Sequence, residues 1–369
     1  MRKKYWKKDV IKSEFLEEIF DTERIPSGEE LKKMYHMEKD RDSLVRADLA
    51  KALVNKYTPE SEAMLRRMAC ERDELVRIEA LDSLCIGREK ESLALLKWKM
   101  KKAEERMERG YAASSYFTVW INRYGYNRES MQKYLESVEE IYQQEKDSWV
   151  LAHYERNRYK AGEKNALERL TAILMEESKE DSYVGYAAKS CMGEIMNIFN
   201  KNEMKNILKE FFPSIPENFR GLQVDTQRLI EKKIYPQVLL LSRENTGLSL
   251  LMEYISYYRE EGPDFGIALS SAGLEPGEEI CADLVRMVKQ KDNFDLCRLQ
   301  YPKPIMHGWW QDFIVPVGIK VRPEDYPFQK VLTLFENVDE NELDYERAEK
   351  MVWKLVSCLR ETYGEVLEE

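Results

Sequence analysis

The sequence of 369 residues predicts a multidomain protein in which an all-α solenoid precedes an α/β domain with a four-stranded parallel sheet. Three observations favour this fold class. A short pattern recurs along the first 200 residues, apolar runs alternate with amphipathic stretches along the last 135, and prolines separate the two regions. We expect the solenoid to span residues 1–232 and the α/β domain to span residues 233–369.

The repeat is clearest in residues 42–53 and 73–84, which read DSLVRADLAKAL and DELVRIEALDSL. Weaker copies begin at Met107, Asp147 and Asp181. Recurrence at this interval indicates a solenoid, in which each unit buries its apolar face only against its neighbours. Aspartate before an apolar run is typical of a helix N-cap, and another amphipathic stretch precedes each copy, so each repeat is expected to be a helical hairpin.

The D-x-x-V-R-x-x-x-A pattern resembles the HEAT-repeat family over residues 28–200. The resemblance implies a curved α-solenoid whose concave surface, built from the second helices, binds a partner. The arginines of the pattern, Arg46 and Arg77, have two interpretations. They either line this groove as a basic row, or form a ladder in which the arginine of one repeat pairs with an aspartate of the next.

After Pro236 the chain alternates between short apolar runs and amphipathic stretches. The strands are expected at 238–242, 265–271, 294–299 and 330–335, and the helices at 247–260, 278–290 and 342–363. Short continuous apolar strands that alternate with helices are typical of a parallel sheet that is covered on both faces. The proline-rich segment 301–329 shows no helical period, although FIVPVGIKV within it suits a short strand or hairpin.

The segment 238–249, VLLLSRENTGLS, reads as a strand, a polar loop and the start of a helix. In this order the N–H groups of the loop and of the first helical turn converge, and the helix dipole adds to them. The segment is therefore a candidate anion-binding loop.

This segment, the SSAGLEPG turn at 270–277 and KVLTLF before the last helix resemble the low-molecular-weight protein tyrosine phosphatase family. The family includes arginine phosphatases and arsenate-reductase-like members, and the resemblance covers residues 237–363. It implies a loop that reads Cys, five residues, Arg and Ser, and an Asp-Pro general acid before the last helix. The residues of this chain depart from that pattern at the catalytic positions.

Ser242 stands at the position of the nucleophilic cysteine, and Leu248 stands at the position of the arginine. Asn245 matches an asparagine that shapes the tight turn, and Ser249 matches the serine that activates the thiolate. The stretch that corresponds to the general acid, ENVDENELDYE, contains no Asp-Pro. The mechanism needs a low-pKa thiolate and a bidentate cation, so we expect no phosphatase activity of the family type and assign no catalytic residue.

Weak anion binding remains compatible with the loop, through Ser242, Arg243, Asn245, Thr246 and Ser249. In this interpretation Arg243 swings over the loop; in the other, it is solvated or paired with Glu244. Trp309 and Trp310 are candidate partner-binding residues, or else they pack on their own domain.

The composition narrows the choice of partners. A net charge of −10 disfavours nucleic acid, and no apolar run is long enough for a membrane span or a signal peptide. The six cysteines are scattered without metal-ligand spacing and suit reduced core thiols, so neither a metal nor a cofactor is expected. We therefore predict a cytoplasmic protein.

The function indicated by the sequence is a non-catalytic protein-binding scaffold, in which a HEAT-like solenoid is joined to a pseudophosphatase domain that binds an anion at most. Two alternatives stay open. One is a hydrolase that acts on a phosphorylated substrate by non-standard chemistry. The other is a nucleic-acid-binding HEAT-like solenoid, which would require a concave face rich in lysine and arginine.

Overall fold

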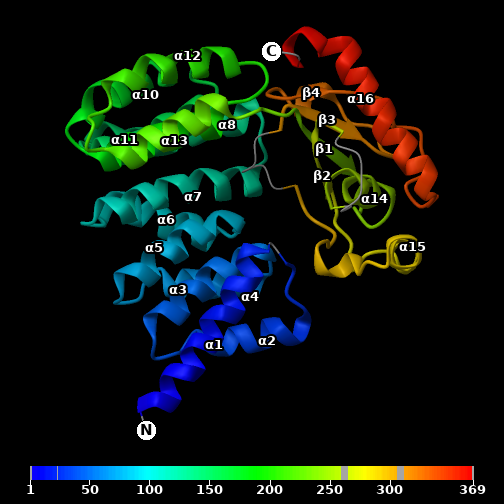
Figure 1. The fold of residues 1–369 in the computed structure, drawn as a ribbon, viewed down its shortest axis with the longest axis horizontal. Coiled ribbons are helices and arrows are strands. Elements are labelled where there is room, and N and C mark those ends of the chain that lie inside the picture. The colour runs from blue at the N-terminus through cyan, green and yellow to red at the C-terminus, as the bar shows by residue number, and fades with distance from the viewer. Residues whose placement is uncertain (1, 23, 259–264, 306–310, 368–369) are drawn as a thin grey trace. The chain divides into compact units, whose positions relative to one another are not determined.

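The computed structural model describes residues 2–22, 24–258, 265–305 and 311–367. It is mostly helical and contains one four-stranded parallel sheet, as the sequence predicts (Figure 1). The chain divides into two compact units. The first holds Met1–Gly125, Val138–Val150 and Cys297–Leu299, and the second holds the remaining residues. The predicted domain boundary at residue 232 falls inside the second unit, where the last helix before the sheet ends, and it stays a prediction.

The helices of the N-terminal part form pairs after α1 (Arg2–Asp21), in the register that the repeats predict. The first helices of the pairs are α2 (Gly28–Met37), α4 (Pro59–Met68), α6 (Lys90–Lys102), α8 (Arg128–Gln144) and α10 (Asn165–Glu176). The second helices are α3 (Ser43–Ala52), α5 (Glu74–Ser83), α7 (Arg106–Tyr124), α9 (Ser148–Lys160) and α11 (Ser182–Ile195). In the first unit α3 packs against α5, and α5 packs against α7 (Figure 1).

The repeat aspartates are N-caps, as predicted. The Asp42 carboxylate accepts a hydrogen bond from the Leu44 N–H at 3.0 Å, and Asp181 accepts one from the Tyr183 N–H at 2.8 Å. Asp73 accepts one from the Val76 N–H at 3.3 Å. Each carboxylate satisfies a first-turn donor that has no partner within the helix.

The repeat arginines form an inter-repeat ladder. The distance from the arginine Nε to the carboxylate is 2.9 Å for Arg46 and Glu71, 2.7 Å for Arg77 and Glu108, and 2.8 Å for Arg109 and Glu145. Each guanidinium also donates to a main-chain carbonyl just before its own helix. The expected aspartate partners are wrong, because these aspartates cap their helices and glutamates pair with the arginines instead.

The helices continue beyond the segment that resembles the repeats. Helices α12 (Lys201–Phe211) and α13 (Arg220–Glu231) follow, and Pro213 and Pro216 lie in the turn between them. No helix among the described residues is long and apolar enough to cross a membrane. Two cysteines expected in the core, Cys70 and Cys297, are exposed.

The sheet has the order β2-β1-β3-β4, and all neighbouring strands are parallel. Its strands are β1 (Gln237–Ser242), β2 (Ala268–Gly273), β3 (Phe313–Pro316) and β4 (Lys330–Val331). The strand expected at 294–299 is wrong, because that segment contains only a 3-10 turn, Leu296–Arg298. The third strand comes instead from the proline-rich segment, where the four residues of β3 are buried.

Both faces of the sheet are covered. On one face, β1 and β3 residues such as Leu240 and Val315 share an apolar core with α14 (Leu248–Glu253), α15 (Ala282–Asp292) and α16 (Tyr345–Leu367). On the other face, Leu239, Leu241, Ala272 and Ile314 pack beneath side chains of irregular chain, among them Ile319 and Tyr326. The edge of the sheet that carries the β1–α14 loop is thus fixed from both sides.

The ladder predicts that Arg77→Ala lowers the free energy of unfolding by about 1–3 kcal/mol, because it removes a charged hydrogen bond from the buried Glu108. Urea unfolding measures the change. Lys133→Ala, which removes only an exposed pair within α8, is the matched control and is expected to leave the stability unchanged. Equal effects of the two variants would show that the ladder does not hold the repeats together.

Candidate functional site

The candidate site is the loop between β1 and α14. β1 ends at Ser242, and α14 begins at Leu248. Asn245 adopts a left-handed conformation with φ of 56°, which asparagine tolerates better than most residues, so the predicted tight turn is present. A side chain at Gly247 would meet the Glu340 carbonyl oxygen at 2.6 Å, so only glycine allows the segment around Glu340 to approach this closely.

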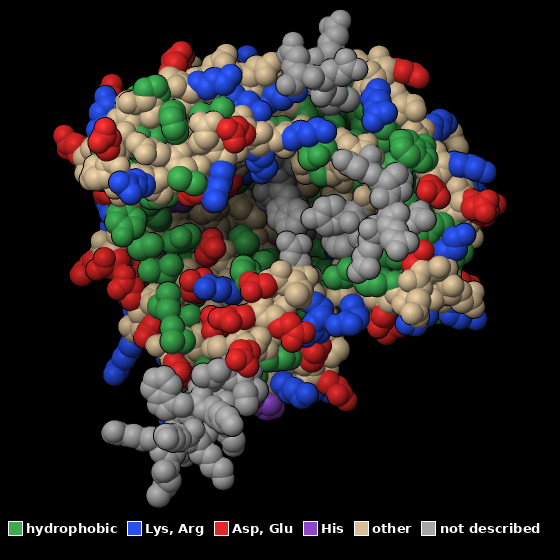
Figure 2. Space-filling view, viewed as in Figure 1, with side chains coloured by type: hydrophobic (Ala, Val, Ile, Leu, Met, Phe, Trp, Pro, Cys, Tyr) green, Lys and Arg blue, Asp and Glu red, His purple; other side chains and the backbone are tan. Residues whose placement is uncertain are grey.

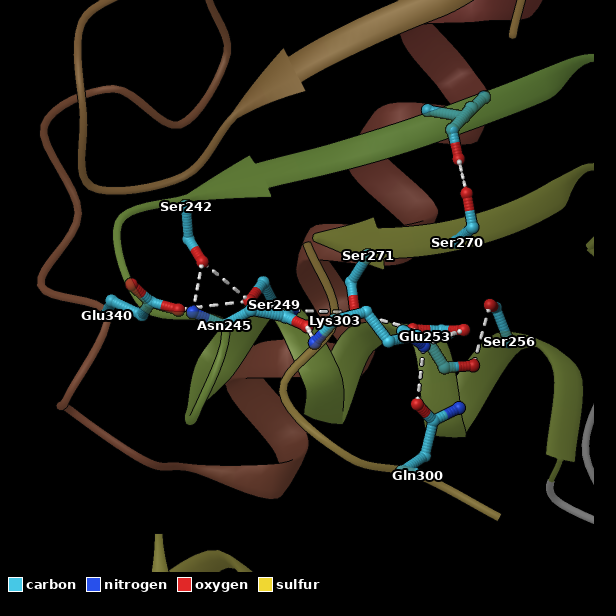
Figure 3. Close-up of polar contacts among 11 residues, drawn as sticks. Ser242, Asn245, Ser249, Glu253, Ser256, Ser270, Ser271, Gln300, Lys303 and Glu340 are labelled. Atoms are coloured by element: carbon cyan, nitrogen blue, oxygen red, sulfur yellow. Dashed lines mark hydrogen bonds and ion pairs between the residues drawn. The ribbon is translucent and has the colours of Figure 1, made fainter. Parts of the chain in front are cut away.

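The hydroxyls of Ser242 and Ser249 point toward one another (Figure 3). Ser242, Asn245 and Ser249 each have 0% of their surface exposed. The Ser242 hydroxyl accepts a hydrogen bond from the Asn245 N–H at 3.0 Å and lies 3.1 Å from the Ser249 hydroxyl. The group at the nucleophile position is therefore part of a buried network and does not face solvent.

The Asn245 amide joins this network to a second one (Figure 3). Its Nδ2 donates to the hydroxyls of Ser249 at 3.1 Å and Ser271 at 2.8 Å, and its Oδ1 accepts from the Lys303 N–H at 2.9 Å. The Ser271 hydroxyl donates in turn to Glu253, which forms a 2.6 Å ion pair with the Lys303 ammonium. One asparagine side chain thus ties β2, α14 and the segment after α15 to the loop.

Glu340 closes the loop from a distant part of the sequence (Figure 3). Its carboxylate accepts a hydrogen bond from the Ser249 hydroxyl at 3.0 Å, and its carbonyl accepts one from the Leu248 N–H at 3.0 Å. Burial raises the pKa of Glu340 above its ordinary value, although hydrogen bonds from Ser242, Ser249 and the Arg243 backbone act in the opposite direction. A carboxylate therefore occupies the loop, but its charge is poorly stabilised there.

The main-chain carbonyls of the loop are also occupied. The SSAGLEPG turn supplies donors to three consecutive carbonyls, those of Ser242, Arg243 and Glu244. A side chain at Gly273 would lie within 3.0 Å of the Arg243 and Glu244 main chain, so glycine permits this docking. These contacts hold the loop in one conformation.

The five residues predicted to bind an anion do not all converge. Ser242, Asn245 and Ser249 meet in the buried network, whereas the Arg243 side chain is 70% exposed and its Nε lies 3.8 Å from a Glu275 oxygen. Thr246 is half-buried, and Leu248 is buried in the core. Among the described residues no arginine side chain thus reaches into the loop, and anion binding by these residues stays a prediction.

Three other residues bear on the sequence predictions. Trp309 and Trp310 lie outside the described residues. Glu340 was missed, because the resemblance implied an Asp-Pro pair in the stretch ENVDENELDYE and gave no role to its other carboxylates. The feature of the sequence that could have indicated Glu340 is the position of this acidic stretch between the last strand and the last helix, where the resemblance places a general acid.

The comparisons with known proteins add little. No protein-family model and no curated protein matches the chain. Among solved structures, a thioredoxin-dependent arsenate reductase from Corynebacterium glutamicum matches with a TM-score of 0.24 and 16% sequence identity, over 55% of this chain and 97% of that chain. Neither the TM-score nor the identity is high enough to assign this chain a fold family or a role.

The raised pKa of Glu340 predicts the effect of Glu340→Gln. The carboxyl group binds its proton more tightly in the folded than in the unfolded protein, so it costs stability as the pH rises through the folded-state pKa. Glutamine does not titrate. The free energy of unfolding of the variant minus that of the wild type should therefore be larger at about pH 7.5 than at about pH 5, as measured by urea unfolding. A change in the opposite direction would mean that the loop favours the carboxylate.

Proposed function

We propose that this chain is a non-catalytic protein-binding scaffold. In this proposal the N-terminal part is a HEAT-like α-solenoid that recognises a protein partner, and the C-terminal part is a pseudophosphatase domain with a closed loop. The observation that carries the proposal is the complete burial of the Ser242 hydroxyl within its network.

Burial of Ser242 supports a lack of catalysis, because a nucleophile must come within contact distance of the atom it attacks. The Ser242 hydroxyl bonds with the Ser249 hydroxyl, the Asn245 main-chain N–H and the Glu340 carboxylate, and of these only Glu340 is a base. Leucine at position 248 supplies no cation for a phosphoryl group. The raised pKa of Glu340 supports the same conclusion, since a loop that stabilised anions strongly would lower this pKa.

A row of exposed apolar side chains supports protein binding. Leu44, Leu75 and Met107 stand at equivalent positions of successive repeats, two residues before the ladder arginines, and are 57%, 39% and 38% exposed. Their helices α3, α5 and α7 pack side by side, so the three positions follow one another across the helices. A hollow of about 680 Å³, lined by Arg46, Glu71 and Arg72 among others, lies between the first two of these repeats. Exposed apolar residues next to a hollow are typical of protein-binding surfaces.

The nucleic-acid alternative receives less support. The ladder arginines each pair with a glutamate, so they do not offer a row of free positive charges. On the face shown in Figure 2, Lys and Arg side chains are interspersed with Asp and Glu. The hydrolase alternative has one favourable observation, the hydrogen bond from Ser249 to Glu340, which gives the network a carboxylate as a base.

Enzyme assays separate the scaffold from the hydrolase. The wild type and Ser242→Ala are expected to release phosphate from para-nitrophenyl phosphate, phosphotyrosine peptides and phosphoarginine peptides at the same background rate, because Ser242 cannot reach a substrate. Turnover by the wild type that Ser242→Ala abolishes would establish the hydrolase instead.

The apolar row predicts which substitutions weaken partner binding. Leu44→Asp combined with Leu75→Asp should reduce the recovery of a specific partner from extracts of the native cell by about tenfold or more, because charges would replace the apolar contacts. Val224→Asp, at an exposed apolar position on α13, is the matched control and should leave the recovery unchanged. Equal recovery with both variants would argue against the row as the binding surface.

A further inference from the structure

The second helices α3, α5 and α7 begin in the same way. Leu44, Leu75 and Met107 are the second residues of these helices, and each lies just after the turn that joins the two helices of its repeat. All three side chains are exposed. Packed neighbouring helices lie about 10 Å apart, so this apolar row is roughly 20 Å long.

The turns beside the apolar row are held by the ladder arginines. The Arg77 guanidinium donates to the carbonyl of Arg72 at 2.6 Å, and that of Arg109 donates to the carbonyl of Glu104 at 2.7 Å. Each acceptor lies five residues before its arginine, and the corresponding residue of the first repeat is Arg41. The three turns are therefore equivalent, and they differ in the charge of their side chains.

The charge of the turns reverses along the apolar row. Arg41 and Arg72 are exposed in the first two turns, whereas Glu104 and Glu105 are exposed in the third. Glu74 is exposed at the start of the middle helix. None of these five side chains forms an ion pair with another residue in the part of the chain that the structure describes. Their charges are therefore free to meet those of a partner.

This arrangement is complementary to itself after a rotation of 180°. When a two-fold axis passes beside Leu75 and crosses the apolar row at a right angle, the rows of two copies run antiparallel. Leu44 of each copy then faces Met107 of the other, and Leu75 faces its own counterpart. Such an interface is isologous, so every contact away from the axis occurs twice.

The same rotation brings opposite charges together. Arg41 of each copy lies opposite Glu104 and Glu105 of the other, which gives an attractive contact at both ends of the interface. Near the axis the charges of Arg72 and Glu74 from the two copies balance. A parallel arrangement would instead place like charges against each other at both ends, so the charges select the antiparallel one.

We propose that the partner of the apolar row is a second copy of this chain, bound in an antiparallel two-fold dimer through the first three repeats. The inference rests on the proposed function, because it takes the apolar row as the protein-binding surface and names its partner. Three apolar side chains from each copy make a small interface, so we expect a Kd on the order of 10–100 µM.

Analytical ultracentrifugation of the full-length chain, from about 5 to about 200 µM, tests the dimer. The wild type should change from monomer to dimer over this range. Leu75→Asp should stay monomeric, because it places two like charges at the axis. Arg41→Glu should weaken association by about tenfold, and adding Glu104→Arg and Glu105→Arg should restore it, because the charge pairs form again with reversed sign.

Arg128→Glu, at an exposed position on α8, is the matched control for the charge reversal and should leave dimerisation unchanged. Circular dichroism checks that each variant is folded. The inference is wrong if the wild type is monomeric at about 200 µM, or if the triple charge variant associates no better than Arg41→Glu. Loss of association in Arg128→Glu would also contradict it.

Disulfide cross-linking with copper phenanthroline as the oxidant tests the position of the axis. The background carries serine in place of the exposed Cys70 and Cys297. Leu75→Cys should cross-link to itself, because a disulfide requires Cβ atoms about 4 Å apart and only this position lies near the axis. Leu44→Cys and Met107→Cys should cross-link in a mixture of the two variants and not alone. Cross-linking of Leu44→Cys alone would indicate a parallel arrangement and overturn the inference.

The inference and the proposed function fail separately. A monomeric wild type ends the dimer, but the recovery of a different protein, lost with Leu44→Asp and Leu75→Asp, would still support the scaffold. A dimer that persists in Leu75→Asp would show that the chain associates through another surface, and it would contradict the inference alone.

Discussion

The loop between β1 and α14 depends on the Asn245 side chain. Its amide donates to two serine hydroxyls and accepts from the Lys303 main chain, while its own backbone stays left-handed. These bonds turn the hydroxyls of Ser242 and Ser249 toward the interior, where Glu340 completes the network. Because buried polar groups must find partners, the same bonds that satisfy the loop remove its hydroxyls from solvent. The same bonds therefore both order the loop and bury the Ser242 hydroxyl.

The helical part is organised by a division of roles among its acidic residues. Aspartates cap the second helices α3, α5 and α11, and glutamates of the following repeat receive the arginines. Each arginine also bonds the main chain before its own helix, so it fixes both the turn within one repeat and the distance to the next. Stacking of this kind leaves the residue two positions before each arginine pointing outward. The exposed apolar positions therefore recur once in each of these helix pairs.

Features with local causes could be predicted from the sequence. The positions of the second helices, the aspartate caps, β1 and the tight turn at Asn245 all follow from short-range patterns, and the structure has them. Features that depend on distant contacts could not. The run FDLCRL has the composition of a strand but contains a 3-10 turn. FIVP pairs with β1 despite its proline, because tertiary contacts decide which segment lies beside β1 in the sheet. Glu340, 91 residues from Ser249, enters the site only through the tertiary fold.

The accessibility of position 242 tests the central claim most directly. The thiol introduced by Ser242→Cys can be alkylated with iodoacetamide and followed by mass spectrometry, with the exposed Cys70 as a reference in the same molecule. A buried position predicts alkylation at least about 100-fold slower than at Cys70, and no further change when phosphate is added. Alkylation as fast as at Cys70, slowed by phosphate, would show an open anion-binding loop around an accessible nucleophile position and would contradict the claim.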